Sequence, residues 1–492
     1  MKIKLLEEPA LEFGLGESIC PKKGIAGLHP YDLENVRPEK ITLGLIGKSE
    51  SVDDIIFWLN SCKKLVRSGK LKLNNLFADF PGFNNDTGFL SQIVHDSGYI
   101  RKLNNSDIES VIKDSDDIDS VIEKIVEIYI SEIKFLTKNK KPDVILCILD
   151  EKLTSIFMAT SKSNKTSTKN KIIHEAQLND DELLPIEDDE FYNEVEFNYK
   201  EYNFRRLLKA KAMKYGIPIQ IMRDKIANPS RDMQDSATIA WNFFTAIYYK
   251  ASGTPWSLKK DSKTIVCYAG ISFYKSRDKK TTQTSVTQIF NEHGKGVILR
   301  GAEVELKKGD LEPHLSENQA FELMNTALVE YYEALKIFPQ RLVIHKSSNF
   351  SEGEINGFKK AISQHNINSL DLVTIMSSPI RIYRDHTYPP LRGTMCAIDS
   401  NNYVLYTRGF VNYFETYPGS YVPDPLLIRL YSHDESPELI CKEILGLTKM
   451  NWNNTQFDRK YPITIECSRK VGDILKYLDK DDVPQLKYSF YM

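Results

Sequence analysis

Basic side chains are concentrated in the segment FRRLLKAKAMKYGIPIQ, residues 204–220, where they could bind a phosphate group. Within ten positions the segment carries Arg205, Arg206, Lys209, Lys211 and Lys214. Arg205 and Lys209 are four positions apart, so they share one face if the segment is a helix. A Gly-Ile-Pro turn follows, and the segment ends on Gln220. Taken alone, these cations also fit a solvated basic surface.

A second segment favours the phosphate interpretation over the solvated surface. The expected helix 235–252 ends in YYKASGTPW, which brings Lys250 next to a Gly-Thr-Pro turn. Two lysines, one arginine and one amide could surround a terminal phosphate, because a phosphate monoester carries nearly two negative charges and several acceptor oxygens. A metabolite phosphate in a small-ligand α/β enzyme would need the same groups, so that alternative stays open.

Alternating strands and helices are expected around this segment. The continuous apolar run in PDVILCILD is typical of a strand buried on both faces of a parallel sheet. Residues 51–68 and 118–137 carry apolar side chains at helical spacing. LNNLFADFPGF is expected to form a strand and a turn, IPIQIMR a strand, and residues 1–50 short strands and turns. We therefore predict an α/β unit over residues 1–258.

The remaining residues, 259–492, begin with expected strands and then alternate between strands and helices. KTIVCYAGISFYKSR reads as one strand, and SVTQIFNEHGKGVILRG as two strands joined by a glycine-containing turn. QRLVIHKSS reads as a further strand, and a strand-helix pair is expected at the end. Helices are expected at 317–336, 352–364 and 436–447. This order of elements is typical of an RNase H-like fold.

Composition limits the classes of protein to consider. The chain has 492 residues, 41% of them hydrophobic and 27% charged, which fits a soluble globular protein of two or three domains. Its net charge of -2 means that any contact with nucleic acid must come from a local basic patch. Seven scattered cysteines without a CxxC pair indicate reduced thiols and a cytoplasmic location. We find no signal peptide and no apolar run long enough to span a membrane.

Three other motifs are excluded by their spacing. GLIGKSES contains Gly-Lys-Ser, but Thr42 stands where a P-loop requires glycine. His174-Glu175 has no second histidine at the spacing of a zinc peptidase. No cysteines and histidines have the spacing of a zinc site.

The basic segment resembles a known domain. RxxxK, then GIPxQ, then KxxGxPW is similar to the MID domain of Argonaute proteins, whose pocket grips the 5′-phosphate of a guide strand. The resemblance implies that the guide ligands are Arg205, Lys209, Gln220 and Lys250. The family often has Tyr or His at the first position, for which Tyr202 and Arg206 are the alternatives to Arg205. The implied fold is α/β, with a Rossmann-like MID domain at 1–258 followed by an RNase H-like PIWI domain at 259–492.

The C-terminal half resembles a PIWI domain in CYAGISF, LVIHKSSNF, PPLRGT, LYTRGF, PDPLLIRLY and ILGLTKMNWNN. In many relatives the terminal carboxylate turns inward and binds a metal ion at the guide phosphate. Met492 is therefore a candidate ligand of Mg²⁺, although an ordinary disordered tail is the alternative. The length and the opening LEEPALEFGLG resemble the short prokaryotic Argonautes, which lack the PAZ-bearing half.

The resemblance also locates the positions of a slicer active site. PIWI slicers hold two Mg²⁺ ions with Asp-Glu-Asp and one further residue. Here the first and second aspartate positions are Ser272 and Ser347, and the last falls near residues 466–468. Serine is neutral and cannot replace a bridging carboxylate, so we expect no target cleavage. The alternative is an RNase H-like guide-directed nuclease in which Glu303 or Glu305 supports an atypical metal site.

The function implied by the resemblance is guide-RNA-directed recognition of a single-stranded DNA target without cleavage. The nucleic acid would follow a basic channel. Lys346, close to the second aspartate position, could also contact its phosphates if it points inward. Short Argonautes form a heterodimer with an APAZ-containing effector, which is a SIR2 or TIR NADase or a nuclease, and act in antiviral defence by abortive infection. The candidate channel residues are Lys275, Arg277, Arg392, Arg408, Lys449 and Asn453.

Overall fold

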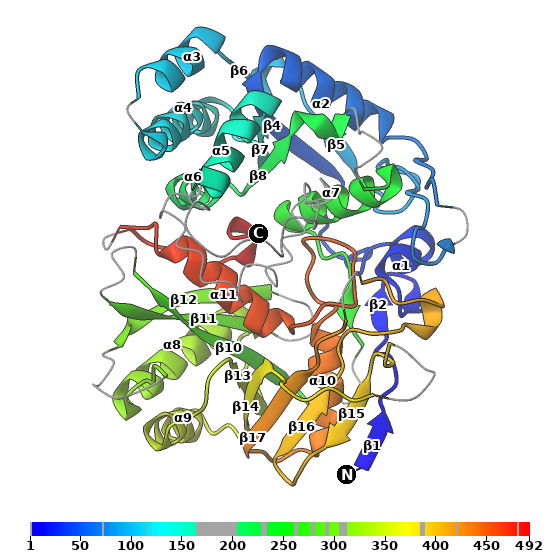
Figure 1. Cartoon of the computed structure of the whole chain (residues 1–492), viewed down its shortest axis with the longest axis vertical. Coiled ribbons are helices and arrows are strands. Elements are labelled where there is room, and N and C mark those ends of the chain that lie inside the picture. The colour runs from blue at the N-terminus through cyan, green and yellow to red at the C-terminus, as the bar shows by residue number, and fades with distance from the viewer. Residues whose placement is uncertain are drawn as a thin grey trace. The chain divides into compact units, whose positions relative to one another are not determined.

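The computed structural model (Figure 1) describes residues 2–70, 73–115, 117–163, 204–227, 234–259, 264–276, 281–290, 295–304, 312–383, 389–419, 422–479 and 482–492. These residues cluster into two units. The first, called the parallel-sheet unit, comprises Asn35–Gly253, Trp452–Asn454 and Met492. The second, called the mixed-sheet unit, comprises Met1–Glu34, Thr254–Asn451 and Thr455–Tyr491.

The parallel-sheet unit is built on β4 (Lys40–Lys48), β5 (Gln92–Val94), β6 (Ile100–Leu103), β7 (Val144–Leu149) and β8 (Ile219–Arg223). The order is β5-β4-β7-β8, β6 also pairs with β4, and every pairing is parallel. All six residues of β7 are buried, because helices cover both faces of such a sheet. The expectation of a buried parallel strand in PDVILCILD is confirmed.

Six helices accompany this sheet: α2 (Ser49–Ser61), α3 (Asn105–Lys113), α4 (Ile118–Asn139), α5 (Glu151–Ser163), α6 (Phe204–Ala212) and α7 (Ser236–Lys250). Helix α4 buries apolar residues at helical spacing, as its sequence predicts. Helix α7 is buried on nearly all sides. Its first turn is capped by Asp235, whose side chain accepts a hydrogen bond from the Thr238 N–H at 3.1 Å.

The mixed-sheet unit contains a nine-stranded sheet of order β1-β15-β16-β17-β14-β13-β10-β11-β12. Strand β13 is parallel to both β10 and β14, and the remaining pairs are antiparallel. The strands are β1 (Lys2–Leu5), β10 (Val266–Lys275), β11 (Thr282–Phe290), β12 (Lys295–Val304), β13 (Arg341–Lys346), β14 (Ser369–Ser377), β15 (Thr394–Ala397), β16 (Asn402–Leu405) and β17 (Leu426–Ser432). A smaller sheet joins β2 (Leu11–Phe13), β3 (Gly16–Ser18) and β9 (Ser257–Leu258).

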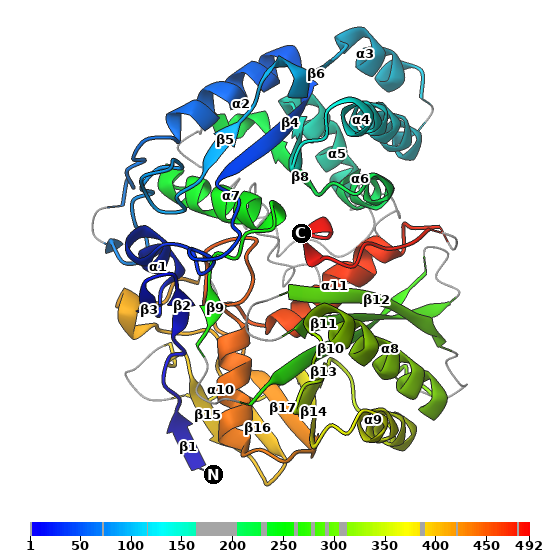
Figure 2. The ribbon, with the colours of Figure 1, turned by 180° about the vertical axis from the view of Figure 1, so that it is seen from behind.

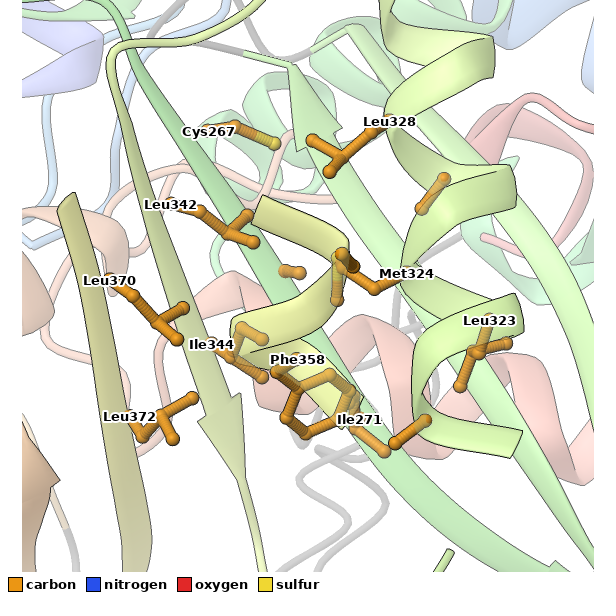
Figure 3. Close-up of a cluster of buried hydrophobic side chains, with 14 of the residues drawn as sticks. Cys267, Ile271, Leu323, Met324, Leu328, Leu342, Ile344, Phe358, Leu370 and Leu372 are labelled. Carbon is orange, nitrogen blue, oxygen red and sulfur yellow. The ribbon is translucent and has the colours of Figure 1, made fainter. Parts of the chain in front are cut away.

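Helices lie on both faces of the large sheet (Figure 2). They are α8 (Glu317–Leu335), α9 (Glu352–Gln364), α10 (Pro437–Leu447) and α11 (Ile463–Leu475), and α1 (Pro21–Leu28) lies beside the small sheet. Figure 3 shows the core under α8 and α9, where Met324 and Phe358 meet Ile271 and Ile344 of the strands. Helix α11 packs on the opposite face, so closely that a Cβ at Gly270 would lie 2.0 Å from the carbonyl oxygen of Thr464.

The structure corrects several expected boundaries. The two units divide at residues 253 and 254, not at 258, and residues 1–34 cluster with the C-terminal unit because β1 pairs with β15. Residues 1–50 also contain helix α1 and the long strand β4, and α2 ends at Ser61 rather than near residue 68. LNNLFADFPGF forms turns with one isolated bridge, between Val66 and Phe80, instead of a strand. The expected strand before α11 is absent from the described residues there.

Candidate phosphate-binding site

Helix α6 presents the basic residues because its other face is apolar. Phe204, Leu207 and Leu208 are buried, whereas Arg205 and Lys209 are partly exposed on the helix. The helix continues as a 3₁₀ turn, Met213–Tyr215, and ends at Gly216 with a φ of 63°. This left-handed conformation suits glycine, and it redirects the chain into Pro218 and strand β8.

Lys250 forms the centre of the candidate site. It is the last residue of α7, is only 2% exposed, and donates a hydrogen bond from Nζ to the main-chain oxygen of Met492 at 2.9 Å. Burial lowers the pKa of Lys250 well below its usual value, and the nearby positive charge of Lys209 lowers it further. Lys209, Lys250 and the last residue of the sequence are therefore brought together by the fold.

Gln220 lies on β8 and is 5% exposed. Its Nε2 donates a long hydrogen bond to the Ile221 carbonyl oxygen at 3.4 Å. Its buried Oε1 has no hydrogen-bond partner in the described part of the chain. A buried acceptor without a donor is costly, and a phosphate dianion would be bound by the Nε2 donor of Gln220, not by this oxygen. Gln220 is not joined to Lys209 or Lys250 by a hydrogen bond.

The remaining guide-ligand candidates are placed less closely. Arg205 precedes Lys209 by one turn of α6, so their Cβ atoms are about 6 Å apart. Arg206 is also on α6 and partly exposed. Tyr202 lies outside the described residues. Lys211 is directed elsewhere, because its ammonium group forms an ion pair with Glu127 of α4.

Two predicted channel residues, Arg392 and Lys449, are instead buried in the mixed-sheet unit. Both form ion pairs with Glu8, at 3.0 Å and 2.7 Å respectively. Lys449 also donates to the carbonyl oxygens of Pro9 and Ile19, and its pKa is lowered to about 8 chiefly by burial. Arg392 and Lys449 therefore hold the N-terminal segment in place, and the prediction that they line a nucleic-acid channel is wrong for this structure.

Lys346 is a further correction. Its side chain is fully buried and forms an ion pair with Glu354 at 2.6 Å. Its ammonium group also lies over the Phe273 and Phe350 rings, at 5.1 and 5.3 Å from the centroids. The pair stabilises the start of α9, since Glu354 also accepts from the Ser351 N–H of the capping box. Lys346 points into the core and cannot contact a phosphate backbone.

The other channel candidates have mixed environments. Lys275 is exposed at the end of β10, and Arg408 is partly exposed. Asn453 is buried, at 4% exposure, in the connection between α10 and α11. Arg277 lies outside the described residues. Lys275 and Arg408 therefore remain candidates for contact with a nucleic acid.

The structure brings Ser272 and Ser347 to the same level of neighbouring strands. Strands β10 and β13 are parallel with Ile271 opposite Lys346, so the next residues on each strand are about 5 Å apart at the backbone. Ser272 is 3% exposed. His345, beside them, has its Nδ1 2.8 Å from Thr464 Oγ1, and burial lowers its pKa to about 3, which leaves it neutral at pH 7.

Two carboxylates are candidate metal ligands beside these serines: Glu466 already has hydrogen-bond partners, and Glu303 lies far from Ser272. Glu466 is partly buried and accepts hydrogen bonds from Asn451 Nδ2 at 2.7 Å and from Arg459 Nη1 at 2.5 Å. Glu303 lies on β12, two strands from Ser272 and at the level of Tyr274, and hence about 12 Å away at the backbone. Glu305 falls outside the described residues. Within the described ranges, no group of three or more His, Cys, Asp or Glu side chains is placed to hold a metal ion.

The sequence interpretation missed the acidic partners of these buried cations. Glu8 and Glu354 were assigned no role, although Ser351-x-x-Glu354 is a readable capping-box pattern. Glu8 had no such signal, because its partners lie more than 380 residues away along the chain.

No helix among the described residues is both long enough and apolar enough to span a membrane.

Comparisons with known proteins place this geometry in context. The Argonaute protein of Aquifex aeolicus (strain VF5) is 23% identical over 428 residues, which cover 85% of this chain and 55% of the relative. No protein-family model matches the sequence.

Solved structures share the fold. Clostridium butyricum Argonaute, bound to a guide DNA and a 19-mer target DNA, superposes with a TM-score of 0.65 and 15% identity over 99% of this chain and 54% of its own. Marinitoga piezophila Argonaute, in complex with a 5′-hydroxyl guide RNA, gives a TM-score of 0.55 and 14% identity. The match covers 100% of this chain and 59% of that Argonaute. The chain spans about half the length of the relatives that it matches. The predicted α/β fold, with MID-like and PIWI-like parts, is confirmed.

Proposed function

Because the chain is related to Argonaute proteins by sequence and by fold, we propose that it binds a guide strand and uses it to recognise a complementary nucleic acid. The observation that carries this proposal is the meeting of Lys209, Lys250 and Met492 at the end of α7. Two cations close enough to repel each other suit a doubly charged phosphate. The pocket would hold the guide 5′-phosphate, and base pairing would supply the sequence specificity.

Within this proposal each residue has a distinct part. Lys209 and Lys250 neutralise the phosphate, Arg205 donates to it from the neighbouring turn of α6, and Gln220 donates to it from Nε2. Met492 would contribute its carboxylate to a Mg²⁺ ion, which fits because carboxylate and phosphate oxygens are the ligands this ion prefers. When bound, Mg²⁺ would offset the charge of the guide phosphates. Lys250 Nζ, which donates a hydrogen bond to the Met492 main-chain oxygen at 2.9 Å, lies next to this candidate ligand.

We also propose that the guide is RNA, that the target is single-stranded DNA, and that the chain acts with a separate APAZ-containing effector in antiviral defence. The effector would be a SIR2 or TIR NADase, or a nuclease, activated by target recognition in the cytoplasm. Support for a recognition subunit comes from the neutral Ser272 and Ser347 positions, which leave the catalytic step to another protein.

The chemistry of the 5′ end tests the pocket directly. We expect a 5′-phosphorylated guide to bind on the order of 1,000-fold more tightly than the same guide with a 5′-hydroxyl, since the charge-assisted contacts of Lys209 and Lys250 contribute about 2–3 kcal/mol each. Competition binding with both guides, each as RNA and as DNA, measures the ratio. Equal affinities for the two guides would contradict the assignment of the pocket to the 5′-phosphate. The comparison with a 5′-hydroxyl guide is relevant because one structural neighbour was solved with such a guide. Recovery of 5′-phosphorylated oligonucleotides with the purified protein would exclude the metabolite alternative.

Target cleavage is expected to be absent. The purified chain, loaded with guide and incubated with labelled complementary DNA and Mn²⁺, should retain the target intact, because neutral serines cannot hold a pair of metal ions. Filter retention of the target in the same reactions confirms that the guide is loaded. Cleavage abolished by Glu303→Ala or Glu305→Ala would instead support the atypical nuclease.

A further inference from the structure

A second basic surface lies in the parallel-sheet unit, in the loop that follows α2. Residues 62–70 read CKKLVRSGK, with four cations and no acidic residue. The loop's cations are exposed: Lys63, Lys64, Arg67 and Lys70. We call this set the α2-loop patch. Lys63, Lys64 and Arg67 have no ion pair within the described residues, whereas Lys70 lies over the Phe77 ring at 4.5 Å.

Three other exposed lysines of this unit are paired with acids. The pairs include Lys102–Asp53 at 2.9 Å, Lys140–Asp96 at 2.6 Å and Lys152–Glu109 at 2.5 Å. The contrast matters because the whole chain is nearly neutral, with 65 basic and 67 acidic residues. A group of unpaired cations on such a chain is a local positive field directed at solvent.

The backbone of the loop is held by hydrogen bonds, so the positions from which its cations project are defined. Val66 and Phe80 exchange two backbone hydrogen bonds of 2.9 Å. The Ser68 N–H donates to Asp79 Oδ1 at 2.7 Å, and the Gly69 N–H donates to Asp235 Oδ1 at 2.7 Å. The neighbouring carboxylates of Asp79 and Asp235 are thus occupied by backbone groups of the loop. A preformed surface loses little conformational entropy on binding.

The patch is separate from the proposed 5′-phosphate pocket. Asp235, which binds the loop, caps the first turn of α7, and Lys250 is the last residue of the same helix. A helix of 15 residues is about 22 Å long. At about 3.4 Å per nucleotide step, that separation corresponds to six or seven nucleotides. One phosphate group cannot contact both sites.

We propose that the α2-loop patch binds the phosphates of the target strand beyond its guide-paired segment, on the 3′ side. This inference rests on the proposed function. A target that pairs antiparallel to a guide continues past the guide 5′ end with its own 3′ flank. That flank is single-stranded and starts near the pocket, so a rigid basic surface about 22 Å away is within its reach. Exposed Phe57, in α2 just before the loop, offers a ring on which an unpaired base can stack.

The test measures target affinity of the guide-loaded protein for three complementary DNAs: one without a flank, one with a 3′ flank of about ten nucleotides, and one with an equal 5′ flank. We expect the 3′ flank to strengthen binding on the order of tenfold at low salt, and the 5′ flank to have no comparable effect. The variant Lys63→Gln/Lys64→Gln/Arg67→Gln should lose this gain and lower the salt slope by about 2.

The matched control is Lys102→Gln/Lys140→Gln/Lys152→Gln, which removes the same charge from paired, exposed lysines of the same unit. It should keep the 3′-flank gain, and thermal melts should show both variants folded. The inference is overturned if the 3′ flank does not raise the target affinity of the wild type, or if the patch variant keeps that increase in affinity. Neither result would affect guide-dependent binding itself. Absence of guide-dependent target binding in the wild type overturns the proposed function and this inference with it.

Discussion

Replacing Lys209 and Lys250 together by alanine is expected to weaken binding of a 5′-phosphorylated guide by about three orders of magnitude. Each charge-assisted contact contributes about 2–3 kcal/mol, and tenfold in affinity corresponds to about 1.4 kcal/mol. Binding of the same guide with a 5′-hydroxyl should change little. The double variant should therefore lose the preference for the phosphorylated end, which competition binding measures.

The pH dependence of guide binding gives a second readout of the same site. Burial and the charge of Lys209 lower the pKa of Lys250 in the free protein. A bound phosphate dianion favours the ammonium form, so its binding raises that pKa and takes up a proton. Affinity should accordingly fall as the pH rises through the pKa of free Lys250. Lys250→Ala should remove this slope.

Controls separate these effects from loss of folding. Lys250→Met keeps most of the buried volume and should behave like the alanine variant in binding. Lys102→Ala/Lys152→Ala removes two exposed lysines paired with Asp53 and Glu109, and should leave guide affinity unchanged. A double pocket variant that still discriminates between 5′-phosphate and 5′-hydroxyl would exclude Lys209 and Lys250 as the phosphate ligands.

The success of the sequence interpretation followed local patterns. The β7 run VILCIL and the α4 periodicity predicted their elements because burial on both faces, or on one face, leaves a signal within a few residues. Ser272 and Ser347 were identified from the family resemblance, and the parallel pairing of β10 with β13 places them on neighbouring strands. The GIPxQ turn was readable because Gly216 requires a positive φ.

The errors arose where distant residues decide the outcome. Arg392, Lys449 and Lys346 have the composition of nucleic-acid contacts, yet each is neutralised inside the fold by a carboxylate. The sequence around a lysine does not reveal such a partner, because the partner comes from a distant part of the chain. A solvent-exposed lysine and a lysine paired in the core therefore cannot be distinguished by sequence spacing. Strand β1 similarly has no local signal for its pairing with β15 at the far end of the chain.

The ion pairs of Glu8 lead to the last expected result: Glu8→Gln should destabilise the mixed-sheet unit by about 3 kcal/mol. Arg392 and Lys449 side chains are 1% and 0% exposed, so removing their shared counter-charge leaves two positive charges in the interior. The N-terminal segment should also loosen in this variant, because Glu8 and Pro9 are both bound by Lys449, whose Nζ donates to the Pro9 carbonyl oxygen at 2.5 Å. Urea denaturation followed by circular dichroism measures the loss.

The destabilisation should depend on pH with a definite sign. Burial by itself would raise the pKa of Glu8, but Arg392 and Lys449 outweigh it and hold the pKa below its ordinary value of 4.5. A carboxylate whose pKa is lower in the folded state than in the unfolded state stabilises the fold fully at pH values above 4.5. This contribution is lost as the pH falls through the pKa of the folded state. The difference in unfolding free energy between wild type and Glu8→Gln should thus be largest near pH 7 and shrink in acid.

Glu17→Gln is the matched control, because Glu17 is an exposed acid of the same N-terminal segment paired with Lys259 at 2.7 Å. Such exposed pairs contribute only about 0–1 kcal/mol, so its stability should stay close to that of the wild type. Adding Lys449→Met to Glu8→Gln should recover part of the loss, since one of the two unpaired charges is removed. If Glu8→Gln unfolds no more easily than Glu17→Gln, then Arg392 and Lys449 are not held inside by Glu8, and their assignment to a nucleic-acid channel is open again.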